Sequence, residues 1–154
     1  MKIPIRMTVN GDQHEIAVEA HHTLLDVLRE RLELRGVKEG CESGNCGACT
    51  VLMNGEAVVS CMVLAPDADG AEILTVEGLA SPAGELHPLQ RKFLEHGAVQ
   101  GGYCTPGMLL SAYALLRKNP HPSGEEVRRA LAGNLCRCTG YAKIVEAVLE
   151  ASRE

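Results

Sequence analysis

The chain contains 154 residues with a formal net charge of −5 at pH 7, and 45% of the residues are hydrophobic. A chain of this length forms one ordinary domain or two small ones, and the apolar content argues against wholesale disorder. No basic cluster for phosphate binding is visible, and no apolar run approaches the roughly 20 residues of a membrane span. We therefore expect a globular protein that binds neither nucleic acid nor membrane.

The N-terminal segment has no apolar region followed by a small-residue cleavage site, and it has no twin arginine. We therefore expect a cytoplasmic protein. The chain has seven cysteines, and clustered cysteines in a reducing compartment more often bind metal or do redox chemistry than form disulfides. The cysteines are thus the first candidates for function.

The first half of the chain shows strand patterns around a single helix. The segments Asn10–Asp12 and Asn54–Gly55 are turn signals between strands. Thr23 is a good N-cap for the helix, with Asp26 as its acidic partner and Gly36 as its end. The expected elements are strands at residues 2–9, 13–19, 50–53, 57–59 and 72–76, a helix over 24–36 and a loop over 37–49.

The second half shows helical patterns and almost no strand pattern. The segment Ser81–Gly84 is a linker signal, Pro106 suits the first turn of a helix, and Ser123 with Glu126 forms a capping box. The expected helices cover residues 88–96, 107–118, 125–131 and 141–152. We therefore predict an α+β protein with two domains, residues 1–79 and residues 80–154, the second of which is a helical bundle.

Three cysteines lie on one glycine-rich loop, and a fourth follows a hairpin. Four residues separate Cys41 from Cys46, two separate Cys46 from Cys49, and Cys61 follows after eleven more. This is the plant-type ferredoxin spacing, in which four thiolates hold a [2Fe–2S] cluster. The glycines of the loop allow backbone N–H groups to approach the sulfurs. These four cysteines are therefore predicted to bind one [2Fe–2S] cluster.

Zinc is the competing metal for these four cysteines. Structural zinc sites usually take two short Cys-x-x-Cys-like pairs, whereas three of the ligands here lie on one loop. The spacing therefore favours an iron–sulfur cluster over zinc.

Cys104, Cys136 and Cys138 form a second group in the helical half. Cys104 lies just before the helix that begins near Pro106, and the other two form a Cys-x-Cys pair between two helices. Such a pair is an awkward disulfide but a natural pair of metal ligands. Because the positive ends of helix dipoles favour anionic sulfur, these loops form a second candidate metal site if they face each other.

Three stretches of the chain carry a family resemblance. They are GCESGNCGACTV at residues 40–51, YCTPGMLLSAYALL at residues 103–116 and ALAGNLCRCTGYAKIVEAV at residues 130–148. The chain closely resembles the small iron–sulfur subunit of the xanthine dehydrogenase/aldehyde oxidase family of molybdenum hydroxylases. The resemblance extends from about Val9 to Ala151.

The resemblance implies a ferredoxin-like (β-grasp) N-terminal domain and a C-terminal four-helix bundle. In the family the bundle holds a second [2Fe–2S] cluster on a Cys-x-x-Cys pair and a Cys-x-Cys pair. Cys136 and Cys138 match the latter pair, and Cys104 matches the second member of the former. Gly101 stands where the first member is expected, so the fourth ligand of the second cluster is missing.

Several groups are open candidates for this fourth ligand. His96 is nearby in sequence, although a lone histidine in a helical stretch is more often a surface residue. Water, hydroxide or a residue of a partner subunit is another candidate, and loss of the cluster is the remaining alternative. Because three of the four ligands are retained, we expect the second cluster to be present.

The resemblance also implies cofactors on other chains. In the family a large subunit binds molybdopterin, and electrons pass through both clusters to FAD on a further subunit or to another acceptor. The residues at the positions of Gln100 and Cys138 lie against the pterin there. From the sequence alone, Gln100 is equally well explained as a helix-end residue that bonds the backbone.

The chain has no phosphate-binding glycine loop, no nucleophile with a base and no acid/base pair of carboxylates, so we expect no catalytic residue on it. The prediction is an electron-transfer subunit of a molybdenum-containing hydroxylase. The alternative is a free-standing [2Fe–2S] ferredoxin, which explains the first cysteine group but leaves the second half without a role.

Overall fold

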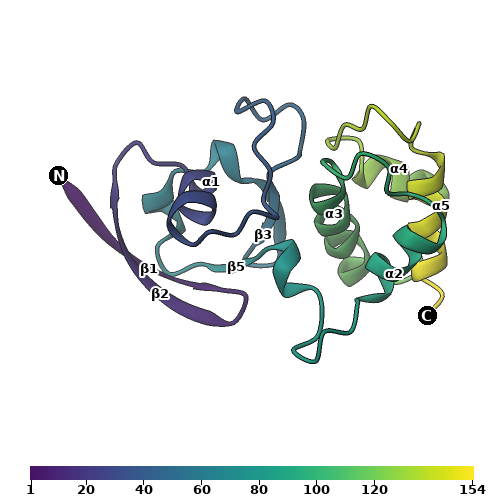
Figure 1. The fold of residues 1–154 in the computed structure, drawn as a ribbon, viewed down its shortest axis with the longest axis horizontal. Coiled ribbons are helices and arrows are strands. Elements are labelled where there is room, and N and C mark those ends of the chain that lie inside the picture. The colour runs from purple at the N-terminus through teal and green to yellow at the C-terminus, as the bar shows by residue number, and fades with distance from the viewer.

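The computed structural model describes residues 1–154, with a sheet half and a helical half side by side (Figure 1). The sheet consists of β1 (Lys2–Val9), β2 (Asp12–Glu19), β3 (Thr50–Met53), β4 (Glu56–Val59) and β5 (Glu72–Leu74). Short helical segments join or follow these strands. Four lie between strands, namely α1 (Leu24–Asp26), η1 (Val27–Arg31), η2 (Ser60–Met62) and η3 (Ala65–Ala68), and η4 (Val76–Gly78) follows β5. The helical half contains α2 (Pro88–Glu95), α3 (Thr105–Lys118), α4 (Gly124–Ala130) and α5 (Ala142–Ala151). The predicted α+β class is confirmed.

The sheet is mixed, with the strand order β2-β1-β5-β3-β4. Strand β1 runs parallel to β5, and the other neighbouring strands are antiparallel. Side chains alternate along β1, so that Ile5, Met7 and Val9 are buried on one face. There they share a core with Leu24 of α1 and Leu28 of η1, which cover that face of the sheet.

The helix that covers the sheet begins as predicted but ends earlier. Thr23 and Asp26 form the expected capping box. The helix then widens into a π-helical turn, and it ends at Arg31 because Glu33 takes a left-handed conformation with φ of 57°. The prediction that Gly36 ends the helix is therefore wrong.

Gly36 instead allows two segments to approach closely. A Cβ atom at Gly36 would lie 2.4 Å from Cγ1 of Val76, and the Gly36 N–H donates to the Glu77 carboxylate at 2.8 Å. This contact involves η4, which replaces the last residues of the strand expected over 72–76. Strand β5 consequently ends at Leu74.

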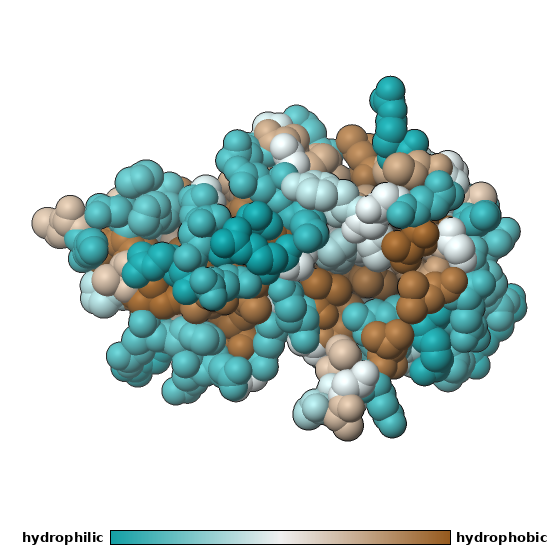
Figure 2. All heavy atoms as spheres, viewed as in Figure 1, coloured by the Kyte–Doolittle hydropathy of each residue, from teal (hydrophilic) through white to brown (hydrophobic).

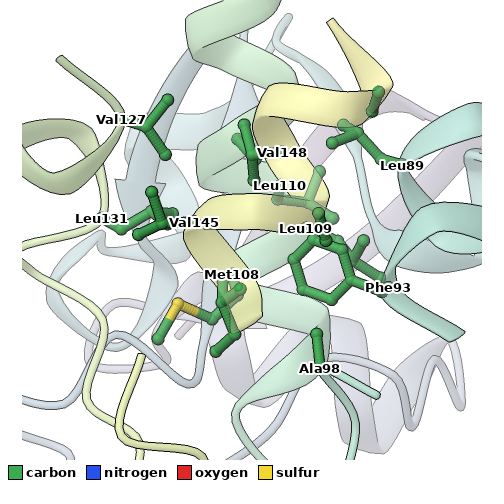
Figure 3. Packing of buried hydrophobic residues seen from close by; sticks show 14 of the residues in the cluster. Leu89, Phe93, Ala98, Met108, Leu109, Leu110, Val127, Leu131, Val145 and Val148 are labelled. Atoms are coloured by element: carbon green, nitrogen blue, oxygen red, sulfur yellow. The ribbon is translucent and has the colours of Figure 1, made fainter. Parts of the chain in front are cut away.

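The helices of the second half enclose a separate apolar core. Phe93 of α2, Met108 and Leu110 of α3, and Val148 of α5 are buried and point toward one another (Figure 3). Full burial of side chains of this size stabilises the fold by about 1.5–3 kcal/mol each. The four helices agree with their predicted ranges to within two residues at either end.

Ser123 caps α4 as predicted, since its hydroxyl accepts from the Glu126 N–H at 3.2 Å. The reciprocal half of the predicted capping box is not formed. The Glu126 carboxylate accepts from the Ser123 hydroxyl and from the Asn119 side chain instead of from the Ser123 backbone.

The surface is polar over most of its area. Hydrophilic residues dominate the face in Figure 2, where apolar patches interrupt them in both halves. None of the helices has the length and apolar character needed to cross a membrane.

Candidate iron–sulfur sites

The loop before β3 surrounds the Cys41 thiol with hydrogen-bond donors. Cys41 Sγ accepts from the backbone N–H groups of Ser43, Asn45 and Cys46 at 3.4, 3.2 and 3.3 Å. The Ser43 hydroxyl and these N–H groups lower the pKa of the exposed Cys41 to about 6. Donors directed at sulfur favour the thiolate, which is the form that binds metal. The loop is therefore suited to present Cys41 as an anionic ligand.

Two glycines allow this loop to close around the thiols. A Cβ atom at Gly40 would lie 2.6 Å from Cys46 Sγ. Gly47 has a φ of 74°, and a Cβ atom there would lie 2.4 Å from the carbonyl oxygen of Gly133 in the helical half. A side chain at either position would displace a thiol or separate the two halves.

Cys49 and Cys61 form the buried part of the first site. The Cys61 N–H donates to Cys49 Sγ at 3.5 Å, and the Ser60 hydroxyl donates to the Cys49 carbonyl at 2.8 Å. Cys61 lies in η2 directly after the β3–β4 hairpin, which brings it back to the loop. Burial and the neighbouring Cys49 thiol raise the pKa of Cys61 to about 11. Metal coordination overcomes this, because a coordinating thiol is deprotonated outright.

The thiols of the first site fit a dinuclear cluster. The Cys46 backbone N–H donates to Cys41 Sγ and the Cys61 backbone N–H donates to Cys49 Sγ, so the four cysteines lie as two neighbouring pairs. Two irons that share bridging sulfides need two thiolates each, which is the arrangement that these pairs provide.

Cys104 and Cys136 form a pair at the second site. Cys104 is the N-cap of α3, and Cys136 lies in the loop between α4 and α5. Burial, together with the neighbouring Cys136 thiol, raises the pKa of Cys104 to about 11. Burial acts in the same direction on Cys136, but hydrogen bonds from the Thr139 hydroxyl and N–H outweigh it and lower the pKa of Cys136 to about 7.

The third cysteine of this site, Cys138, faces Gly101. A Cβ atom at Gly101 would lie 3.3 Å from Cys138 Sγ. Gln100, Gly101 and all three cysteines line a pocket of about 240 Å³. His96, the sequence candidate for the fourth ligand, is the C-cap of α2 and does not line this pocket.

Asn134 and Leu135 connect the two sites, although the sequence did not single them out. The Leu135 N–H donates to the Cys46 carbonyl at 2.9 Å. The buried amide of Asn134 donates to the Gly47 carbonyl at 3.1 Å and accepts from the Ser111 hydroxyl at 2.7 Å. Both cysteine-bearing loops therefore lie on the same side of the molecule (Figure 1), and these hydrogen bonds join them.

Comparisons with known proteins identify the relatives of this chain. The chain matches a family described as 2Fe-2S iron-sulfur cluster binding domain over residues 7–77, and another described as [2Fe-2S] binding domain over residues 75–149. The nicotinate dehydrogenase small FeS subunit of Eubacterium barkeri is 55% identical over 147 residues, which cover 96% of this chain and 93% of that subunit. A probable xanthine dehydrogenase subunit of Bacillus subtilis is 46% identical over 99% of this chain and 87% of its own length. The crystal structure of quinoline 2-oxidoreductase from Pseudomonas putida 86 superposes with a TM-score of 0.93 at 46% identity, covering 99% of this chain and 96% of that one.

The fold and the two family matches thus define an electron-transfer protein with [2Fe–2S]-binding domains. More specifically, the chain belongs to the small iron–sulfur subunits of the xanthine dehydrogenase/aldehyde oxidase family of molybdenum hydroxylases, and it is the electron-transfer subunit of such an enzyme. The resemblance drawn from the three sequence stretches is confirmed, and the free-standing ferredoxin is not favoured.

Proposed function

We propose that the chain carries two [2Fe–2S] clusters and relays electrons from a molybdenum-binding partner subunit to FAD or another acceptor. The first cluster is assigned to Cys41, Cys46, Cys49 and Cys61, and the second to Cys104, Cys136 and Cys138. A [2Fe–2S] cluster supplies one-electron redox chemistry at a potential set by hydrogen bonds to its sulfurs and by burial. The residues of this chain supply those hydrogen bonds, as the three N–H donors to Cys41 illustrate.

The hydrogen bond from the Leu135 N–H to the Cys46 carbonyl is the observation that carries the proposal. Leu135 immediately precedes Cys136, so a short path of covalent bonds and one hydrogen bond joins a thiol of each site. The buried Asn134 amide fixes this contact through the Gly47 carbonyl. A relay between two sites gives the helical half a role that a free-standing ferredoxin would not need.

The same proposal divides the chain into a ferredoxin-like (β-grasp) domain, residues 1–79, and a four-helix bundle, residues 80–154. Two separate apolar cores support this division, one between the sheet and α1 and the other among α2 to α5. Leu52 of β3 packs into the helical core, so the two domains meet in an apolar contact. This contact keeps the relative position of the two thiol sites fixed.

The second site is proposed to face the molybdenum-binding subunit. Gln100 and Cys138 are exposed at the pocket, where we expect them to approach the pterin of the partner's cofactor. Tyr103 and Leu135 line the same pocket with side chains that are 54% and 55% exposed. Exposed apolar side chains beside a ligand site are typical of a docking surface. FAD is expected on a further subunit near the first site, and the complex in the cytoplasm.

Affinity purification of the tagged chain from cells that produce the complex tests this function. We expect a large molybdenum-containing subunit and a flavin-containing subunit to co-elute. The variant L135E places a charge on the proposed docking surface and should lose the molybdenum subunit. The matched control L64E, at a leucine of the sheet half that is 46% exposed, should retain it. A stable monomer that is fully active in electron transfer without partners would contradict the proposal.

A further inference from the structure

Taking the ligand assignment of the proposed function as given, we propose that the second iron–sulfur site is open at residue 101 and takes a small exogenous thiolate as its fourth ligand. The space between Gly101 and Cys138 is the geometrical basis. The pocket of about 240 Å³ in front of these residues provides the route of entry.

The position opposite Cys138 is the one that lacks a donor. A Cβ atom at Gly101 would lie 3.3 Å from Cys138 Sγ and, apart from its chain neighbours, would meet no other heavy atom within 4 Å. The other two thiols, Cys104 and Cys136, are close enough for each to influence the pKa of the other, and both line the pocket. Because each iron of a [2Fe–2S] cluster takes two protein ligands, the missing ligand belongs to the iron that Cys138 would bind.

No other side chain at the pocket replaces the missing cysteine. Besides cysteines, the residues that line the pocket include no histidine, aspartate or glutamate, and the remaining lining cysteine, Cys46, belongs to the first site. The Thr139 hydroxyl is engaged with Cys136 Sγ at 3.1 Å. The Tyr103 hydroxyl donates to the Glu39 carbonyl. Gln100 also lines the pocket, but its amide oxygen is a hard donor, whereas iron–sulfur clusters select soft thiolates. The fourth donor is therefore assigned to a molecule from outside this chain.

The size and charge of the pocket suit a small thiolate. Its volume is several times the ~30 Å³ that a water molecule occupies in the liquid, so a molecule of a few heavy atoms fits. Arg137 is its only charged lining residue, so no acidic group repels an anion. Iron–sulfur clusters select soft thiolate ligands. An entering thiol would give its proton to solvent and its sulfur to iron, and no electron would be transferred in this exchange.

The test compares the purified native complex with complexes that carry G101C or G101A. G101C supplies the fourth thiolate from the chain, whereas G101A fills the same space without a donor. The readouts are iron per chain and the EPR spectrum of the dithionite-reduced protein, neither of which depends on turnover. Each sample is measured after small thiols have been removed and again after 2-mercaptoethanol has been added. The signal of the first cluster is the internal control.

We expect thiol removal to shift the g values of the second signal in the native complex and 2-mercaptoethanol to restore them. The G101C spectrum should respond to neither treatment, and G101A should lose the second signal or keep it insensitive to thiol. A native second signal that ignores both treatments would overturn the inference. The inference would also be overturned if the native complex held about two irons per chain with or without added thiol, while the G101C complex held about four. If G101C also holds only about two, the second cluster of the proposed function fails as well.

Discussion

The two cysteine sites of this subunit are built in different ways. In the first site one loop supplies three cysteines, together with the backbone N–H groups that donate hydrogen bonds to Cys41 Sγ. In the second site, Cys104 comes from the start of α3, and Cys136 and Cys138 come from the α4–α5 loop, so two distant segments have to meet. The four cysteines proposed for the first site therefore all lie between residues 41 and 61. The second depends on the packing of the helical half and lacks a side chain at Gly101.

The largest effect is expected from the removal of a buried ligand of the first site. Cys61 is the one cysteine of that site outside the loop, and serine in its place offers a hard oxygen in place of a thiolate. We expect C61S to abolish the first EPR signal and to lower the iron content by about two per chain. The neighbouring variant M62S, at an exposed methionine, should keep both. Full iron in C61S would show that the four-cysteine assignment is wrong.

The contact between the two sites gives the next largest effect. The variant N134A leaves the buried Ser111 hydroxyl without its acceptor and removes the Asn134 hydrogen bond to the Gly47 carbonyl, which still accepts from Thr50. We expect this to cost about 1–3 kcal/mol of unfolding free energy. Urea denaturation measures this loss. N119A removes an amide whose hydrogen bonds lie at an exposed helix end, and we expect less than about 1 kcal/mol there. Equal losses in the two variants would argue against a special role for the contact.

The close approach of the two halves can be tested with a pair of glycines. A Cβ atom at Gly107 of α3 would lie 2.3 Å from the Gly47 carbonyl oxygen, whereas one at Gly133 would meet nothing within 4 Å. Alanine normally stabilises a helix relative to glycine by about 1 kcal/mol. We nevertheless expect G107A to lower Tm, with overpacking that costs about 1–3 kcal/mol, and G133A to leave Tm nearly unchanged. An unchanged or higher Tm for G107A would mean that the halves are not tightly docked.

The smallest expected effect is a pH dependence of Tm that arises in the helical half. Burial, with a contribution from Arg91, lowers the pKa of His87, whose Nδ1 accepts from the Leu89 N–H at 3.1 Å. The pKa of His87 in the folded protein lies below its unfolded value of about 6.5. The stability that neutral His87 contributes is therefore complete above pH 6.5 and is lost as the pH falls through the folded pKa. We expect a slightly lower Tm at pH 5 than at pH 7.5. H87N keeps an N-cap acceptor and should reduce this difference, and an identical pH dependence in both proteins would refute the role of His87.

Local signals made much of the fold and the first site predictable from the sequence. The spacing of Cys41, Cys46 and Cys49 is a local pattern, and the Thr23 cap acts within one helical turn. Hydrophobic alternation likewise located β1, because its period is set by the strand itself. These features need no knowledge of what packs against them.

Several of the missed features depend on contacts between distant segments. Gly36 lies beyond the end of the helix and packs instead against Val76, about forty residues away in the chain. Asn134 gave no signal in the sequence other than its place just before the Cys-x-Cys pair. Its role becomes visible only when the amide meets Gly47 and Ser111. The second site is similar, since the sequence shows that Gly101 replaces a cysteine but not that it faces Cys138.

Iron quantitation combined with EPR on the dithionite-reduced complex tests the central claim most directly, namely that both sites hold a cluster. We predict two distinct [2Fe–2S] signals and about four irons per chain. A single signal with about two irons per chain would contradict the account, because it would leave Cys104, Cys136 and Cys138 without a cluster.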